Sequence, residues 1–337
     1  MDLTAFVGKL LEEQDGDVLR EGIRVLSQAL METEVAGLIG AERHERTEDR
    51  IVRALGVEGI SKSEVSRICG ELDTAVTAFR TRPITGEHRY VWLDATYHKV
   101  RVDRRVISQA TVVAVGVTSD GERQVLGVDV GPSEDRAFWT AFLRSLVKRG
   151  LRGVRLVISD AHEGLKAAIS TALSGAAWQR CRVHFMRNLL ATGPQGAREA
   201  IAAIVRTIFA QPDHASALTQ LRKVADGLRA RFPQAANRLE EAAEDILAYR
   251  HCPSEHHRQL HSTNPLERLN KEIKRRSNVV GIFPNAAAVL RLVGAVLLEQ
   301  DDEWAVAERR YFSVESMARL TTPALSTTTQ EILAAIA

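Results

Sequence analysis

Apolar residues recur along this chain with two different periods, and the change between them separates its regions. In the first 50 residues, Val25, Leu26 and Leu30 stand at helical spacing among charged neighbours. From Arg89 the period shortens, and segments 89–102, 105–118 and 122–131 are rich in Val, Ile, Thr and Tyr, which favours strands. A turn of Ser, Asp and Gly at 119–121 joins the last two segments. We therefore predict three antiparallel strands.

Helical and strand patterns alternate after these strands. Ser133 and Asp135 open an amphipathic helix that ends at Gly150. A buried strand at 154–158, a helix over about 161–173 and a strand-like segment at 178–185 follow. The order β-β-β-α-β-α-β predicts an α/β fold of the ribonuclease H-like type, with a mixed sheet flanked by helices.

Strand signals vanish between Arg187 and Ala248, where the pattern predicts an all-helical insertion, and helices resume at Pro265 and Asn285. A helical region and a helix-turn-helix-like pattern, whose second helix would run from Ser61 to Cys69, precede the sheet. The predicted organisation is a helical segment at 1–50, a helix-turn-helix-like remnant at 51–85, the first part of the core at 86–187, the insertion at 188–260, the completion of the core at 261–315 and a peripheral tail at 316–337.

Composition narrows the class of protein only slightly. The 337 residues carry 45 Lys and Arg against 43 Asp and Glu, so the overall charge argues neither for nor against nucleic acid. Acidic residues dominate the first 50 positions, which leaves the remainder more basic. The three cysteines form no recognisable disulfide framework, which favours a reducing cytoplasm. The longest apolar runs are strand-length, so we expect no membrane span.

Three acidic residues carry the candidate chemistry. Asp94 lies within the first predicted strand, Asp160 follows the fourth, and Glu267 lies on a later helix. Two strand aspartates and a helical glutamate offer the hard oxygen ligands that paired divalent cations require, and a basic helix beside them suits DNA. We therefore predict a composite metal site of the nuclease type.

The two aspartates also have structural explanations. Asp94 could be a solvated edge-strand residue paired with Lys99 or Arg101. Asp160 could be a helix N-cap, because Glu163 stands three residues after it. Its position at the carboxyl end of a strand favours a functional site, since sites in α/β proteins gather there.

Glu267 has a structural explanation as well. With Asn264 as N-cap and Pro265 at the first helical position, Glu267 would complete a capped helix start. Five basic residues follow it within ten positions and are either a solvated helix face or a phosphate-binding surface. These candidate DNA contacts are Arg268, Lys271, Lys274, Arg275 and Arg276.

The pair Cys181 and His184 stands three residues apart and could begin a zinc site. Its further ligands would come from a His-rich stretch downstream, which contains His251, Cys252, His256, His257 and His261. The spacing matches no recognised zinc finger, so a supporting structural role stays open beside zinc.

Several long motifs together resemble a known family. The stretches ISKSEVSR, WLDATYHKVR, FWTAFLRSLVKRGLRGVRLVISDAHEGLKAAI, WQRCRVHFMRNLL and HSTNPLERLNKEIKRRSNVVGIFPN lie between about Gly56 and Phe312. They resemble bacterial insertion-sequence transposases of the Mutator type, which are D-D-E enzymes with a ribonuclease H-like core. The resemblance implies a catalytic triad of Asp94, Asp160 and Glu267, which holds Mg²⁺ (or Mn²⁺). It also implies a Cys-x-x-His element at Cys181 and His184.

The resemblance implies cutting of double-stranded DNA at the ends of an insertion sequence and joining of the freed 3′ hydroxyl to target DNA. Both steps are in-line phosphoryl transfers. A homodimer or higher synaptic assembly in a bacterial cytoplasm, associated with the nucleoid, is expected because two DNA ends must be joined. Weaker candidates for DNA contacts are Arg182, His184 and Arg187.

One departure from the family pattern lies at Arg50 and Ile51, where a basic segment with further helices is expected but not found. The end-binding region is therefore expected to be shortened. This leaves two alternatives to an active transposase: a catalytically silent DNA-binding regulator of transposition, or a metal-dependent nuclease of the same fold.

Overall fold

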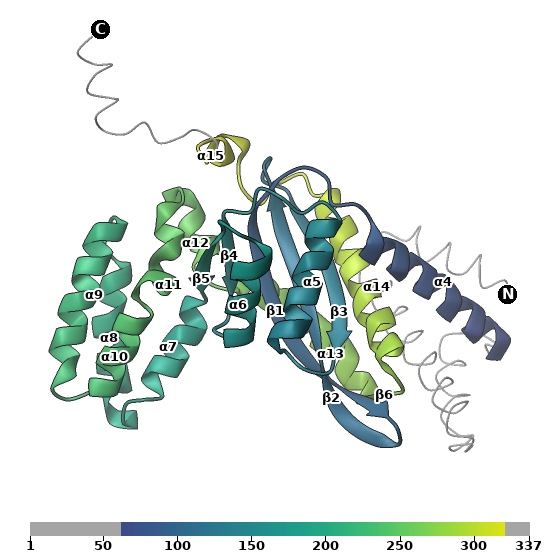
Figure 1. Cartoon of the computed structure of the whole chain (residues 1–337), viewed down its shortest axis with the longest axis horizontal. Helices are drawn as coiled ribbons and strands as arrows, with labels where there is room; N and C mark the ends of the chain where they lie inside the picture. The colour runs from purple at the N-terminus through teal and green to yellow at the C-terminus, as the bar shows by residue number, and fades with distance from the viewer. Residues whose placement is uncertain (1–61, 321–337) are drawn as a thin grey trace, which may run out of the picture.

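The computed structural model describes residues 62–320, so the expectations for segment 1–50 and for the junction at Arg50 and Ile51 lie outside the described residues. Its centre is a six-stranded mixed sheet in the order β3-β2-β1-β4-β5, with β6 paired to β1 (Figure 1). The strands are β1 (His88–Val102), β2 (Arg105–Thr118), β3 (Arg123–Gly131), β4 (Leu156–Ser159), β5 (Ala177–Arg180) and β6 (Ile282–Phe283).

The first three strands form the predicted antiparallel meander. The turn between β2 and β3 uses Gly121, whose φ of 83° favours glycine. The turn between β1 and β2 places Asp103 and Arg104 at positive φ, as a tight two-residue hairpin turn requires. β4 and β5 then run parallel to β1 on its other side.

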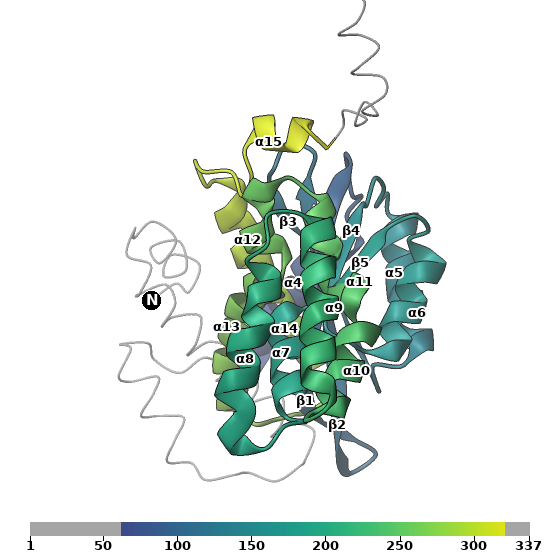
Figure 2. The same ribbon diagram turned by 90° about the vertical axis from the view of Figure 1, so that its left-hand side faces the viewer.

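Helices cover both faces of the sheet (Figures 1 and 2). On one face lie α5 (Arg136–Lys148) and α6 (Glu163–Ala172). On the other lie α13 (Asn264–Val280) and α14 (Ala286–Ala305), and α4 (Lys62–Thr81) packs against α14. The predicted helix starts at Asp135 and Asn285 are confirmed, and the side chains of both residues cap α5 and α14 by accepting a backbone N–H in the first turn.

Alternate residues of β1 enter the two different cores. Val91 and Leu93 pack with α5 and α6, whereas Tyr90 and Trp92 pack with residues of α13 and α14. The alternation of a strand therefore turns Asp94, two residues after Trp92, toward α13.

The stretch from Arg182 to Leu247, most of which was predicted to be helical, forms five α-helices beyond the β5 edge of the sheet (Figure 1). They are α7 (Arg182–Leu190), α8 (Arg198–Phe209), α9 (His214–Arg229), α10 (Pro233–Glu241) and α11 (Ala243–Leu247). Their apolar faces form a core of their own that runs from Phe185 to Leu247. Short helices connect and complete the fold: η1 (Gln195–Ala197), η2 (Ala248–His251), η3 (Ser254–His256), α12 (His257–Leu260) and α15 (Val314–Ala318).

Four sequence-based boundaries differ from the structure. The strand predicted at 178–185 ends at Arg180, and its second half begins α7, whose Phe185 is buried in the helical core. β4 lies slightly later than the predicted 154–158, and α4 continues to Thr81 rather than ending at Cys69. Residues 316–320 are not peripheral, because Met317 and Leu320 are buried in the main core. None of the helices described between residues 62 and 320 is long and apolar enough to cross a bilayer.

Candidate functional site

Asp94 and Asp160 lie near each other, just beyond the point where the pairing between β1 and β4 ends. β4 pairs with β1 as far as the partners Trp92 and Ile158, and β6 pairs with β1 only from Lys99 onward. Asp94 follows Trp92 by two residues on β1, and Asp160 follows Ile158 by two residues, just beyond the end of β4. The parallel register therefore sets the two aspartates side by side at the carboxyl end of β4.

Asp94 is a confined carboxylate. Its Oδ1 accepts a hydrogen bond from the Ala95 backbone N–H (2.9 Å) and its Oδ2 accepts one from Asn270 Nδ2 (2.6 Å). Burial raises the pKa of Asp94 to about 6; the hydrogen bond from Ala95 opposes this shift, and the negative charges of Asp160 and Glu134 add to it. Such a carboxylate favours a proton or a cation beside it.

The edge-strand explanation of Asp94 is wrong. β1 is central, with β2 on one side and β4 on the other, and the Asp94 carboxylate bonds to Asn270 rather than to Lys99 or Arg101. Asn270 is a site residue that the sequence analysis missed. Its position three residues after Glu267, on the same helix face, could have indicated it.

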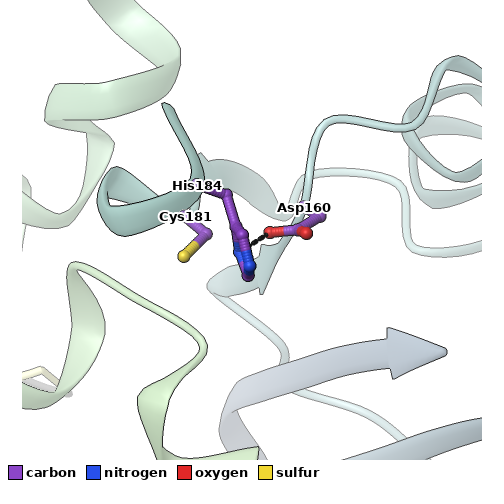
Figure 3. Close-up of side chains that lie close together, drawn as sticks. All are labelled: Asp160, Cys181 and His184. Atoms are coloured by element: carbon purple, nitrogen blue, oxygen red, sulfur yellow. Dashed lines mark ion pairs between the residues drawn. The ribbon is translucent and has the colours of Figure 1, made fainter. Parts of the chain in front are cut away.

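Asp160 forms an ion pair with His184 of α7, between its Oδ1 and the histidine Nδ1 (Figure 3). Hydrogen bonding to Asp160 and then to Cys181 raises the pKa of His184 to about 10, which makes this histidine a cation near neutral pH. The N-cap explanation of Asp160 is wrong, because His162 occupies the N-cap position of α6, without a side-chain capping bond. Asp160 thus lies in the loop with its carboxylate turned to His184.

Cys181 connects this group to the start of α13. Its Sγ accepts hydrogen bonds from the backbone N–H and the hydroxyl of Thr263, at 3.4 and 3.3 Å. Burial alone would raise the pKa of this thiol, but hydrogen bonds from His184 and Thr263 outweigh burial and lower it. A continuous chain of contacts therefore runs from Asp160 through His184 and Cys181 to Thr263.

The capping prediction for Glu267 is also wrong. α13 begins one residue earlier than predicted, with Thr263 as N-cap, and both Leu266 and Glu267 donate their backbone N–H to the Thr263 carbonyl oxygen. The contact of Thr263 with Cys181, far away in sequence, fixes this start. Glu267 is half-buried one turn before Asn270, on the helix that faces Asp94.

The three predicted acids do not form one tight cluster. Within residues 62–320, two groups of at least three potential ligands have all their ligand atoms within 4.8 Å of one another. The first is Asp160, Cys181 and His184, and the second is His214, Glu244 and His251. Asp94 and Glu267 both lie outside these groups, although Asp94 is close enough to Asp160 for their charges to interact.

The predicted basic run of α13 divides into two sets. Arg268, Lys271 and Lys274 are exposed. Arg275 and Arg276 instead donate to Glu272, and Arg276 is 7% exposed and also pairs with Glu299 (3.0 Å). Arg275 is exposed as well, so only Arg276 is buried, where it packs α13 against α14.

The alternative zinc site of Cys181, His184 and the His-rich stretch is not assembled. His256 bonds to Tyr90 and Ser316 in the core. His257 and His261 each contact a nearby backbone carbonyl oxygen. His251 lies in the second ligand group, with partners that the sequence analysis did not select.

Comparisons with known proteins identify the family. A sequence profile described as "Transposase, Mutator family" matches residues 49–307. The chain is 47% identical over 275 residues to a transposase for insertion sequence element IS1081 of Mycobacterium tuberculosis, across 81% of this chain and 66% of the relative. It therefore spans about two thirds of that relative's length.

Two further relatives agree. The IS406 transposase of Burkholderia multivorans is 43% identical across 77% of this chain and 67% of its own length. The IS256 transposase of Tn4001 from Staphylococcus aureus is 35% identical across 87% and 74%. A solved simian T-cell lymphotropic virus intasome with 12% identity, covering 64% of this chain and 67% of its own, has a TM-score of 0.24, which is too low to compare folds. By the profile match and these relatives, the chain belongs to the Mutator family of transposases.

Proposed function

We propose that this protein cuts DNA strands at the ends of an insertion sequence and joins them to target DNA. The observation that carries the proposal is the pair of neighbouring carboxylates, Asp94 and Asp160, at the opening of the sheet, faced by the helix that carries Glu267. The relatives, which are transposases for insertion sequence elements, support the same activity.

The strand order β3-β2-β1-β4-β5 supports a ribonuclease H-like core. Three antiparallel strands followed by two parallel ones match the layout expected from the sequence. The separate apolar core of the helices from Phe185 to Leu247 supports their assignment as an insertion into that fold.

The residues present fit divalent cations. His184 pairs with Asp160, whereas the half-buried Asp94 carboxylate bonds only to neutral donors and has a raised pKa, so a cation beside it is favoured. Asp94, Asp160 and Glu267 would hold Mg²⁺ or Mn²⁺, which prefer oxygen ligands. Bound there, the cations would supply an activated attacking oxygen and a stabilised leaving oxygen.

The other side chains would position this site. Asn270 orients the Asp94 carboxylate, and His184 orients that of Asp160. Cys181 fixes Thr263, and with it the beginning of the helix that presents Glu267. The exposed Arg268, Lys271 and Lys274 continue along the same helix and would contact phosphates of double-stranded DNA.

Glu267→Gln tests the proposal. Because Glu267 contributes its backbone to the helix start but is no cap, the substitution should leave thermal stability nearly unchanged. It removes a charged ligand, so cleavage and joining of DNA that carries the element's ends should fall below detection in Mg²⁺ or Mn²⁺. Glu241→Gln, on the exposed surface of α10, is the matched control.

The same assay separates the alternatives. Cleavage without joining by the unchanged protein would indicate a nuclease of the same fold. DNA binding without any cleavage would indicate a silent regulator. Normal cleavage by the Glu267→Gln variant would remove Glu267 from the site.

Joining of two ends also requires a homodimer or larger assembly, which sedimentation with end DNA would detect.

A further inference from the structure

A second group of potential metal ligands lies in the helical segment, away from the paired aspartates. His214 is the first residue of α9, Glu244 lies on α11, and His251 ends η2. Although 37 positions separate the first residue from the last, their ligand atoms all lie within 4.8 Å of one another. Tertiary folding alone brings two imidazoles and a carboxylate to this point.

The geometry leaves His214 without a good protein partner. Its Nε2 atom is buried and has no hydrogen-bond partner among the described residues. The Glu244 Oε2 atom stands 3.5 Å away, and the His251 ring lies 4.2 Å from the His214 ring, centroid to centroid, tilted by 34°. Around tetrahedral zinc, with bonds of about 2.0–2.1 Å, ligand atoms are separated by roughly 3.3–3.5 Å.

A direct ion pair explains this arrangement poorly. The Glu244 side chain is 71% exposed, and exposed pairs contribute little to stability, so this contact by itself does not justify a buried, unpartnered imidazole nitrogen. A cation that accepts lone pairs from all three side chains would satisfy the nitrogen and neutralise the carboxylate together.

The backbone at each ligand is held by its neighbours. Asp213, before His214, caps α9 by accepting the Ser216 N–H at 2.8 Å. Asp245, after Glu244, pairs with Lys166 of α6 at 2.7 Å.

Arg250, before His251, donates to the carbonyl oxygens of Phe209 and Gln211 at the end of α8. The backbone at all three ligand positions is therefore held before any metal binds, which lowers the cost of ordering the site.

We propose that His214, Glu244 and His251 form a zinc site that fastens the helical segment to the sheet. Two imidazoles and one carboxylate favour Zn²⁺ over Mg²⁺, which prefers oxygen ligands throughout. The site joins the start of α9 to α11 and η2, and both of these pack against β5. Water completes the fourth position.

The test is a titration of the full chain with Zn²⁺ in excess Mg²⁺, followed by calorimetry and repeated with Co²⁺ for its absorption spectrum. The unchanged protein should bind one ion here, with a spectrum lacking thiolate charge-transfer intensity. His251→Ala and the more conservative Glu244→Gln should each weaken Zn²⁺ binding about 100-fold. Zn²⁺ should raise the Tm of the unchanged protein and of the Glu241→Gln control but not that of His251→Ala.

Cys181→Ser separates this site from the group around Asp160. If Zn²⁺ binding is lost in Cys181→Ser and retained in His251→Ala and Glu244→Gln, the ion belongs to the Asp160 group and the proposal fails. It fails equally if the unchanged protein binds no Zn²⁺, or if all variants bind it with one affinity.

Discussion

Two carboxylates beside the middle of α13 show opposite behaviour. Asp94, on β1 opposite the first half of α13, has its pKa raised to about 6 by burial and has another aspartate beside it. Glu272, two residues after Asn270 on α13, has its pKa lowered to about 2 by hydrogen bonds from Arg275 and then Arg276, against the effect of burial. The middle of α13 therefore faces one carboxylate that bonds only to neutral donors and carries another that bonds to two arginines.

The difference between the two pKa values distinguishes a carboxylate with a candidate function from one with a structural role. A carboxylate that the fold keeps at a raised pKa costs stability, so it indicates a place where a ligand is expected. A carboxylate bonded to two arginines contributes to packing, and these arginines are then less available to contact DNA. Two of the five basic residues that look equivalent in sequence, Arg275 and Arg276, are thus bonded to Glu272.

The largest expected difference between the two carboxylates is in cleavage. Asp94→Asn should lower the rate of DNA cleavage about 10³-fold or more, because it removes a charged metal ligand. Glu272→Gln should change that rate less than about threefold. The measurement is cleavage of end-bearing DNA in Mg²⁺. Equal losses in the two variants would erase the distinction.

DNA binding should depend on the exposed lysines of α13. Replacing Lys271 and Lys274 with Ala should weaken binding roughly tenfold at low salt, for every DNA sequence alike, and reduce the slope of log affinity against log salt by about two. Arg222→Ala with Lys223→Ala, on the exposed side of α9, removes equal charge elsewhere. An unchanged slope in the α13 variant would show that these lysines do not contact DNA phosphates.

Stability should respond to Asp94 in a pH-dependent way. Its folded pKa lies above the ordinary value, so the folded chain binds this proton more tightly than the unfolded chain does, and stability is lost as pH rises through about 6. The Asp94→Asn variant has no carboxylate at this position, so its stability should not fall in this way as pH rises. In metal-free buffer it should be more stable than the unchanged protein by about 1–2 kcal/mol at pH 8 and similar to it near pH 4. Chemical denaturation at both pH values measures this, and a destabilised variant at pH 8 would contradict it.

The smallest effect concerns Glu272. Its folded pKa is depressed, so its contribution is present above the ordinary glutamate pKa and is lost as pH falls through about 2. Glu272→Gln should cost about 1 kcal/mol at pH 7, since Arg276 retains Glu299 as a partner. The cost should shrink at pH 3, whereas Glu241→Gln should cost nothing at either pH. A cost that is constant with pH would argue against the ion pairs.

Local pattern was sufficient for much of the fold. The strands of the meander, the helix starts at Asp135 and Asn285, and the helical character of the region after Arg187 all follow from periodicity and turn residues, which act over a few positions. The sequence also identified Asp94 and Asp160 as candidates. Asp94 is a charged residue inside a predicted strand, and Asp160 follows the carboxyl end of another, and both features are visible without knowledge of contacts. The motifs around them were sufficient for the family.

Tertiary structure decided what these residues touch. Asn270 meets Asp94 across 176 positions, and Thr263 meets Cys181 across 82, so no local rule could place the start of α13 or the partner of the buried carboxylate. His214 and His251 likewise come together from positions far apart in the sequence. The sequence alone also does not indicate which basic residues of α13 bond to Glu272. Sequence determines which segments become helices and strands because that preference is local, but pKa values, ion pairs and ligand groups depend on side chains that only the packed sheet and helices bring together.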